Sequence, residues 1–211
     1  MTDLILSLDV ISKNEATRIA TACADHVDAI KIGYPLVLGA GIGIVKELES
    51  LGRPLIADFK VADIPNTDRL ICEQVFSSGF SAVIAHAFPG RDSASVCVDV
   101  AHDHGGECYI VSEMSHPGAT EFFHGGNAEK MAAIAVETGA DGIIAPATRT
   151  ERIKALRGIV GTLKIFSPGV GAQGADPATV APLVDGIIVG RSIYESGRPE
   201  LAAEKFRVHC R

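Results

Sequence analysis

The chain has 211 residues and 47% hydrophobic content, which is enough for one sizeable core and short for two. Its formal net charge of −7 offers no general attraction for nucleic acid, so an anionic ligand needs a local positive site. No apolar run approaches the roughly 18–20 residues of a membrane span, and the start of the sequence has no basic leader. The five cysteines are scattered and form no C-x-x-C pair, so we expect reduced thiols in a cytoplasmic protein rather than a zinc or disulfide framework.

Eight short apolar runs, rich in Ile, Val and Leu, recur along the chain and predict β-strands. In chain order they are Leu4–Asp9, Ala29–Gly33, Pro54–Lys60, Ala82–Phe88, Glu107–Glu113, Gly142–Ala147, Lys164–Pro168 and Gly186–Gly190. Helix-like segments lie between the runs, and the clearest of them are Asn14–His26, Asn66–Ser78, Arg91–His104 and Asn127–Thr138.

This alternation predicts an α/β protein with a parallel sheet, because each run is too apolar for a sheet with one wet face. Eight units favour closure into a (β/α)8 TIM barrel over an open doubly wound sheet, as one compact domain over residues 1–211. The connection Ser115–Gly126 is long for a compact barrel. It holds a Pro-Gly pair, a Gly-Gly pair and two adjacent phenylalanines. Loops of this length are usually functional, so we expect it to close over the site.

Charged residues stand at the ends of three consecutive strand runs, where a barrel interior is normally apolar. They are Asp9, the lone Lys31, and the pair Asp58 and Lys60. Alternation places Asp58 and Lys60 on one strand face, about 6.5–7 Å apart, at the end of the barrel where catalytic residues gather. Burying one unpaired charge costs several kcal/mol, so we expect these four residues to form an alternating network of ion pairs.

Four further features have competing interpretations. Asp63, on the loop after the third strand run, is either a cap for the following helix or a catalytic residue. The segment Gly39–Gly43 does not fit G-x-G-x-x-G and is interpreted as packing glycines or a helix break. His86 lies in an apolar strand and is predicted to make a satisfied hydrogen bond in the core. His102 and His104, two residues apart on a helix, do not face one metal ion.

The segments after the last two strand runs predict a phosphate site. Ser167–Gly174 carries three glycines, and Gly190 and Arg191 follow the eighth run. Loops after strands seven and eight are the usual phosphate site of such barrels. Glycines let backbone N–H groups approach the anion, and Arg191 adds a bidentate charge.

The segment Asp58–Thr67, with Asp58, Lys60 and Asp63 in an Asp-x-Lys-x-x-Asp motif, resembles the catalytic motif of the orotidine 5′-phosphate decarboxylase family in its short microbial form. The likeness covers nearly the whole chain. The other segments that carry it are Leu8–Asp9, Ile30–Gly33, Glu113–Gly118, Ser167–Gly174 and Val189–Arg191.

This resemblance implies decarboxylation of orotidine 5′-phosphate to uridine 5′-monophosphate, the last step of de novo pyrimidine nucleotide synthesis, without a metal or cofactor. Lys60 would protonate C6 of the pyrimidine, and Asp58 would lie against the substrate carboxylate. Lys31 and Asp63 would complete the charged array. The chain would form a homodimer in which Asp63 and Thr67 reach the partner's site, and the loops Ser115–Gly126 and Gly171–Asp176 would close over the ligand. The substrate-binding residues implied are Asp9, Lys31, Asp58, Lys60, Asp63, Ile64, Thr67, Ser115, Pro168, Gly169, Val170, Gly171, Ala172, Gln173, Gly174, Gly190 and Arg191.

The chemistry of these residue types agrees with that reaction. Decarboxylation leaves a carbanion, and a cationic Lys60 next to the developing charge would stabilise it and donate a proton. One alternative is a magnesium-dependent sugar-phosphate decarboxylase or synthase of the same superfamily, which has a Glu where this chain has Lys31, because a divalent ion needs oxygen ligands. The other is a non-catalytic phosphate-binding barrel.

Overall fold

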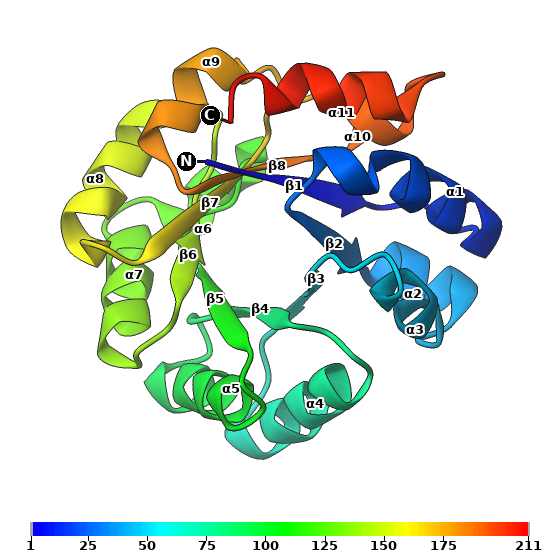
Figure 1. The fold of residues 1–211 in the computed structure, drawn as a ribbon. Helices are drawn as coiled ribbons and strands as arrows, with labels where there is room; N and C mark the ends of the chain where they lie inside the picture. Colours follow the sequence, from blue (N-terminus) through cyan, green and yellow to red (C-terminus); the bar gives the residue numbers. More distant parts are fainter. Residues whose placement is uncertain (1, 211) are drawn as a thin grey trace.

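The computed structural model describes residues 2–210 and contains eight parallel strands that close into a barrel, in the order of the chain (Figure 1). The strands are β1 (Asp3–Leu8), β2 (Ala29–Gly33), β3 (Leu55–Val61), β4 (Ala82–His86), β5 (Glu107–Val111), β6 (Gly142–Ile144), β7 (Lys164–Pro168) and β8 (Gly186–Val189). Pairing of Asp3 with Gly186 and of Leu6 with Val189 closes the sheet. The predicted (β/α)8 barrel is confirmed.

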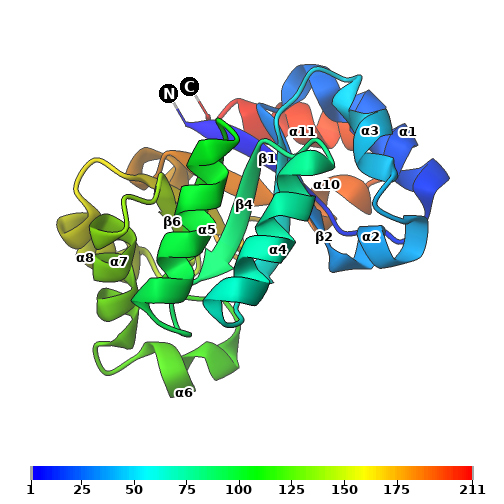
Figure 2. The ribbon, with the colours of Figure 1, turned by 90° about the horizontal axis from the view of Figure 1, so that it is seen from below.

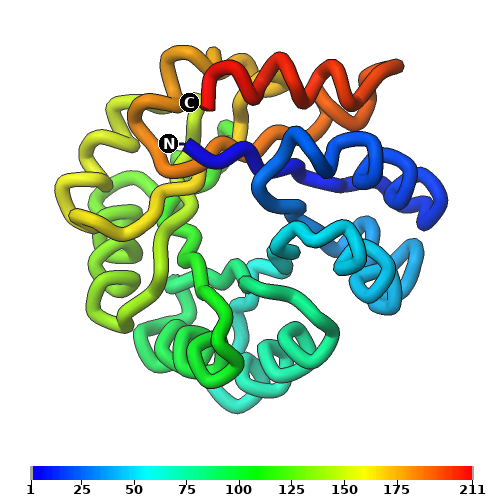
Figure 3. Tube along the Cα trace, in the orientation of Figure 1, coloured from blue at the N-terminus to red at the C-terminus, as the bar shows by residue number. Residues whose placement is uncertain are grey.

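Helices form an outer ring around the strands, as the ribbon and the chain trace both show (Figures 1 and 3). They are α1 (Lys13–Cys23), α2 (Tyr34–Ala40), α3 (Ile44–Glu49), α4 (Pro65–Ser77), α5 (Arg91–Asp103), α6 (Thr120–Phe123), α7 (Asn127–Glu137), α8 (Thr150–Val160), α9 (Pro177–Val180), α10 (Arg191–Tyr194) and α11 (Pro199–Arg207). In Figure 2, α6 projects from the end of the barrel toward which the strands run. This helix belongs to the long connection that the sequence singled out.

Five strands end earlier than the sequence predicts. β1 stops at Leu8, β4 at His86, β5 at Val111, β6 at Ile144 and β8 at Val189. Regular strand pairing stops at the barrel mouth although the apolar composition continues, so apolar composition alone overestimates the strand there.

The glycine-rich segment after β2 is both a helix break and a packing site, as predicted. Helix α2 ends at Ala40, Gly41 has a φ of +80°, and α3 begins at Ile44. A Cβ built at Gly39 would lie 2.3 Å from the carbonyl oxygen of Ile11, so only glycine lets α2 approach the loop after β1.

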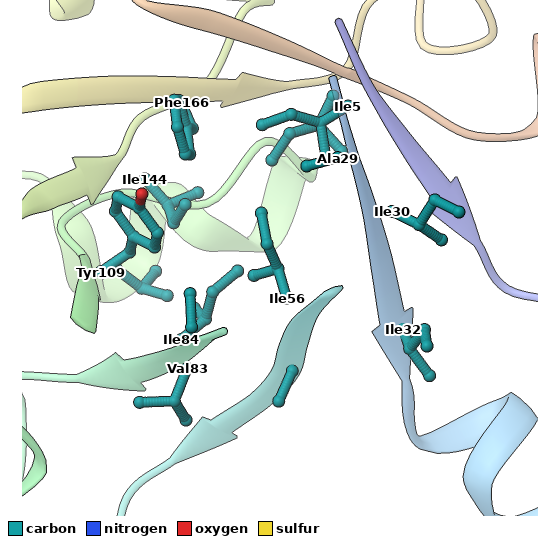
Figure 4. Packing of buried hydrophobic residues seen from close by; sticks show 14 of the residues in the cluster. Ile5, Ala29, Ile30, Ile32, Ile56, Val83, Ile84, Tyr109, Ile144 and Phe166 are labelled. Carbon is teal, nitrogen blue, oxygen red and sulfur yellow. The ribbon is translucent and has the colours of Figure 1, made fainter. Parts of the chain in front are cut away.

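The barrel interior is filled by branched and aromatic side chains, among them Ile5, Ile56, Ile84 and Ile144 (Figure 4). At the end where the strands begin, the rings of Tyr109 and Phe166 lie 4.7 Å apart. Polar groups finish this end of the core: the Tyr109 hydroxyl donates to Glu107, and Lys164 Nζ donates to the same carboxylate at 2.6 Å. The barrel is therefore a packed core and not a pore.

All five cysteines are free and buried in the structure, in agreement with the expectation of reduced thiols. Within residues 2–210, no helix has the length and apolar character that a membrane crossing requires.

Candidate active site

One pocket opens at the carboxyl ends of the strands and encloses a volume of about 240 Å³. Strand-end residues of the barrel line its walls, and the connections after β5, β7 and β8 form its rim. The lining residues are Ser7, Asp9, Lys31, Asp58, Lys60, Ile84, Val111, Glu113, Met114, Ser115, Ile144, Pro168, Gly169, Val170, Ala172, Gln173, Ile188, Gly190, Arg191 and Tyr194.

The four predicted strand-end charges meet on one wall of this pocket. Lys31 Nζ lies 2.5 Å from Asp58 Oδ2 and 3.8 Å from Asp9 Oδ1, and Lys60 Nζ lies 2.6 Å from Asp58 Oδ1. The side chains of β1, β2 and β3 thus alternate in sign, and the expected network is confirmed. Lys31 is only 5% exposed, so its pairing is an energetic requirement.

Asp58 lies at the centre of the network and stays ionised. Desolvation raises the pKa of Asp58, but the adjacent charges of Lys31 and Lys60, with their hydrogen bonds, outweigh it, and the net pKa is lowered. The pocket therefore holds two ammonium groups that share one carboxylate. A carbanion or carboxylate of a ligand placed here would meet both signs of charge.

Lys60 has an unusual backbone. Its φ is +47°, the one positive value of a non-glycine residue within residues 2–210. The register of β3 against β4 shifts between Ala57 and Val61, so the strand bulges at this point. A left-handed conformation at such a residue costs about 1–3 kcal/mol, and the surrounding strands hold it in place. Alternation predicted the face on which Lys60 lies, but not this bulge.

Five predicted site residues do not line the pocket of their own chain, and three of them belong to the connection from β3 into α4. Asp63 and Ile64 are exposed on the loop after β3, and Thr67 follows on α4. Asp63 Oδ1 accepts a hydrogen bond from the backbone N–H of Ile64 at 2.7 Å, while Ile64, not Asp63, is the N-cap of α4. The exposed side chains of Asp63 and Ile64 do not line the pocket and are available to another surface.

The predicted phosphate segment forms a tight loop beside Arg191. Gly169, Gly171 and Gly174 all have positive φ values, and the N–H of Gly171 donates to Ala175 at 3.0 Å. A Cβ at Gly171 would lie 2.5 Å from the hydroxyl of Ser192, which explains a glycine where the loop meets α10. Gly171 and Gly174 are the two predicted site residues of this segment that do not line the pocket.

Arg191 is exposed at the first position of α10, and within residues 2–210 no carboxylate lies within ion-pairing distance of it. Lys31 and Lys60 are both ion-paired with Asp58, whereas Arg191 has no such partner among residues 2–210. The glycine loop and this guanidinium together form a local positive site in a negative molecule, as a phosphate requires.

The two predicted closing loops approach each other over the pocket. A Cβ at Gly169 would lie 3.4 Å from Gln173 Oε1 and 3.6 Å from Ser115 Cβ. The sequence did not single out the buried carboxylate beneath Ser115. Glu113 is fully buried and pairs with Arg149 at 3.2 Å and with Arg152 at 2.7 Å.

Arg149 also donates to the carbonyl oxygens of Met114 and His116, at 3.0 and 3.2 Å, and so ties the start of the long connection to α8. The other pocket residues absent from the prediction were Ser7, Ile84, Val111, Met114, Ile144, Ile188 and Tyr194. A hydroxyl or an apolar residue at a strand end carries no distinctive signal in one sequence. A charged residue at the end of an apolar run, such as Glu113, does, and could have been found by the reasoning that found Asp58.

The prediction for His86 was wrong. Its Nδ1 atom is buried and has no hydrogen-bond partner among the described residues. Burial, with a smaller effect of the Lys60 charge, lowers the pKa of His86 to about 4. The ring instead packs against Phe88 and Phe123, at centroid distances of 5.8 and 6.3 Å. A neutral, apolar contact replaces the expected polar one.

His102 and His104 pair with different carboxylates, those of Asp141 and Glu73. Within the part of the chain that the structure describes, no group of three or more His, Cys, Asp or Glu residues is arranged to hold a metal ion. The two histidines thus have different partners, as expected for residues two apart on a helix.

Comparison with known proteins gives consistent matches over the full length. Residues 2–206 match the family described as orotidine 5′-phosphate decarboxylase / HUMPS. A relative from Methanococcoides burtonii named orotidine 5′-phosphate decarboxylase is 58% identical over 96% of this chain and 94% of its own length. One of the same name from Methanosarcina mazei is 54% identical over 96% of this chain and 92% of its own.

Solved structures agree with these relatives. Orotidine 5′-monophosphate decarboxylase from Methanocaldococcus jannaschii, in complex with the inhibitor BMP, has a TM-score of 0.95 at 41% identity and covers 100% of this chain and 99% of its own. The Pyrococcus horikoshii enzyme has a TM-score of 0.90 at 41% identity, with 98% of each chain covered. The similarity therefore includes both the barrel and the connections that form the pocket.

Proposed function

Since this chain belongs to the orotidine 5′-phosphate decarboxylase / HUMPS family and is a decarboxylase, we propose that its pocket converts orotidine 5′-phosphate to uridine 5′-monophosphate in the cytoplasm, without metal or cofactor. The observation that carries the proposal is the ion-pair network in which Asp58 lies between Lys31 and Lys60. In this network a carboxylate and an ammonium group lie side by side, which supports a site where a substrate carboxylate leaves and a proton replaces it.

The reaction step follows from this pair. The bond between C6 of the pyrimidine and its carboxylate breaks, carbon dioxide departs, and the electron pair stays on C6. The ammonium group of Lys60 stabilises that charge and donates one proton to C6; the neutral amine then regains a proton from water. Asp58 disfavours the substrate carboxylate nearby, and its hydrogen bond with Lys60 Nζ at 2.6 Å orients the ammonium group.

The phosphate end supplies binding energy away from the reacting carbon. The glycine loop Pro168–Gly174 and Arg191 bind the phosphate, and Asp9 and Lys31 bind ribose hydroxyls. Ser115 and Gln173, which approach each other near Gly169, close over the pyrimidine and the phosphate. Binding energy from these remote groups lowers the barrier only if it holds the closed geometry in which Lys60 meets C6.

Metal independence is supported by the lysine at position 31. A divalent ion prefers oxygen ligands, and here an ammonium group lies between the carboxylates of Asp9 and Asp58 where such an ion would need to bind. A magnesium-dependent sugar-phosphate enzyme is not compatible with that charge.

The test is an ultraviolet assay of orotidine 5′-phosphate turnover with and without EDTA, on the wild-type and on Lys60→Ala. We expect equal rates with and without the chelator, and no measurable turnover of Lys60→Ala, while uridine 5′-monophosphate still binds in calorimetry. Loss of activity with EDTA would refute metal independence. Undiminished turnover by Lys60→Ala would refute the proposed proton donor, and binding without turnover by the wild-type would leave only a phosphate-binding barrel.

A homodimer that shares its sites is the second part of the proposal. Ile64, the N-cap of α4, is followed at three-residue spacing by Thr67 and Leu70 on that helix, and Ile64 and Leu70 are 65% and 61% exposed. Phe88, 67% exposed, precedes α5, which packs beside α4. Large exposed apolar side chains next to Asp63 support an interface on this face, with Asp63, Ile64 and Thr67 directed to the partner's pocket.

Hybrid dimers test this sharing. A hybrid of Lys60→Ala and Asp63→Ala chains, isolated with two affinity tags, has one site with both residues intact and one site with neither. We expect about half of the wild-type activity per dimer from two chains that are each inactive alone. An inactive hybrid would mean that Asp63 serves its own chain.

A further inference from the structure

The backbone of Asp63 is held from both sides by two buried side chains that no catalytic role explains. Its N–H donates to Asp68 Oδ1 at 2.9 Å, and its carbonyl oxygen accepts from the Ser93 hydroxyl at 2.7 Å. Asp68 belongs to α4 and Ser93 to α5, and these helices pack against each other. The exposed loop after β3 is thus fixed at Asp63, the charged residue that this loop contributes to the proposed shared site.

The buried position of the Asp68 carboxylate is energetically unfavourable. It is 1% exposed and has no lysine or arginine within ion-pairing distance among residues 2–210. Burial raises the pKa of Asp68, and the hydrogen bonds from the Asp63 amide and the Ser93 hydroxyl oppose that rise. A buried carboxylate without a cation is normally avoided, so its contact with Asp63 calls for a reason beyond packing.

Ordinary helix capping does not account for the contact. The N-cap of α4 is Ile64, whose side chain caps nothing, and Asp68 is the fourth residue of the helix. A capping box joins the N-cap to the third helical residue. Here a carboxylate one residue further along reaches back past the N-cap to Asp63, and a second helix holds the other side of the same residue.

We propose that Asp68 and Ser93 are positioning residues for Asp63, which clamp its backbone so that its carboxylate reaches the partner's charge network at a fixed place. This inference rests on the proposed catalytic role of Asp63. A misplacement of about 1 Å at a charged site can cost about a hundredfold in rate. Without these two hydrogen bonds, the loop would lose conformational entropy each time a shared site assembles.

The main variants are Asp68→Ala, Asp68→Asn and Ser93→Ala, with Asp92→Ala as a matched control. We expect Asp68→Ala to lower kcat/KM about ten- to a hundredfold, chiefly through kcat, and Ser93→Ala to lower it less. Asp68→Asn should restore most of the loss, because its amide oxygen accepts the same N–H while its amide nitrogen donates to Ser93. Asp92→Ala removes another first-turn carboxylate, from α5, and should leave kcat/KM unchanged.

A double-mutant cycle on kcat/KM then separates positioning from a general structural role. If Asp68 acts through Asp63, the Asp63→Ala/Asp68→Ala enzyme is no slower than Asp63→Ala alone. Additive losses, or no loss in Asp68→Ala, would overturn the inference. The cycle does not depend on which subunit's site Asp63 serves.

A hybrid of Lys60→Ala with Asp68→Ala locates the effect. We expect about half of the wild-type activity per dimer, because the intact site combines Lys60 of one chain with a clamped Asp63 of the other. Failure of this hybrid, where Lys60→Ala with Asp63→Ala succeeds, would place Asp68 in its own chain's site and overturn the clamp. If both hybrids are inactive, the shared site of the proposed function is refuted. The double-mutant cycle then decides whether Asp68 acts through Asp63.

Discussion

At the scale of single residues, the site depends on charges that cannot be removed one at a time. Asp58 is hydrogen-bonded to Lys31 and Lys60 at 2.5 and 2.6 Å, and Lys31 has only Asp9, at 3.8 Å, as a second partner. Removing one member of a buried pair leaves an uncompensated charge, which costs more than the pair contributes. The same network that performs the proposed chemistry therefore also determines local stability.

Asp58→Asn should reduce the free energy of unfolding by about 3 kcal/mol, because it leaves Lys31 buried without its main partner. The double variant Lys31→Met/Asp58→Asn should recover most of this loss, since it removes the buried cation as well. Urea unfolding at neutral pH measures both. Equal stabilities of Asp58→Asn and wild-type would contradict the requirement for pairing.

His86 should make stability depend on pH below the neutral range. Its pKa in the folded chain is lowered to about 4, whereas an unfolded histidine titrates near 6.5. Below about pH 6.5 the unfolded chain binds a proton that folded His86 does not. The stability it contributes is therefore full above that pH and falls as the pH drops toward 4.

From pH 7.5 to pH 5 we expect the free energy of unfolding to fall by about 2 kcal/mol more in the wild-type than in His86→Phe. The phenylalanine keeps a ring against Phe88 and Phe123 but cannot titrate. Denaturant unfolding at a series of pH values gives the slope of the free energy of unfolding against pH for each of the two proteins. Identical slopes would mean that His86 is protonated in the folded state.

At the scale of elements, the sequence predicted all eight strands, the network at the ends of β1, β2 and β3, and the glycine loop after β7. These predictions succeed because apolar periodicity, and a charged residue within or at the end of an apolar run, can both be recognised in a short stretch of sequence. The unsatisfied His86, the bulge at Lys60 and the contact of Asp68 with Asp63 were not predictable. The first two depend on contacts of β4 with neighbouring elements. Asp63 and Asp68 are only five residues apart, but the sequence does not indicate that Asp68 is buried and turned back toward the Asp63 amide.

The spacing of β6 and β7 offers a test at this scale. A Cβ at Gly142 would lie 2.4 Å from the carbonyl oxygen of Lys164, so Gly142→Ala must push the strands apart. We expect it to cost about 1–3 kcal/mol of unfolding free energy, with unchanged kcat per folded molecule. Gly158→Ala is the control: it lies exposed in α8 with open space around it, and should stabilise by about 0.5–1 kcal/mol. A Gly142→Ala enzyme as stable as wild-type would show that the strands have room to spare.

At the scale of the whole molecule, one face of the barrel remains unexplained in a single chain. It holds Ile64, Leu70 and Phe88 beside the clamped Asp63. The pocket wall made by Asp9, Lys31, Asp58 and Lys60 lies at the mouth, next to the loop that leaves β3. The proposed dimer accounts for both the apolar face and the outward direction of Asp63.

Leu70→Asp should therefore dissociate the dimer and reduce kcat/KM together, because a charge on α4 would be buried at the interface. Val208→Asp, which adds the same charge at an exposed apolar position beyond α11, on the opposite side of the ring in Figure 1, should remain dimeric and active. Sedimentation velocity and activity across a dilution series measure the two properties. A fully active Leu70→Asp monomer would contradict the shared site.

The polar group at the strand starts has a consequence for how such a protein can evolve. Glu107, Tyr109 and Lys164 finish the core at the end far from the pocket, so changes there alter resistance to heat without altering the reaction. The charges at the mouth are constrained twice, because the network of Asp9, Lys31, Asp58 and Lys60 contributes to stability and, in the proposed function, also performs the chemistry. Selection for a new growth temperature can therefore act on the strand starts without changing the rate, whereas a change at the mouth alters both.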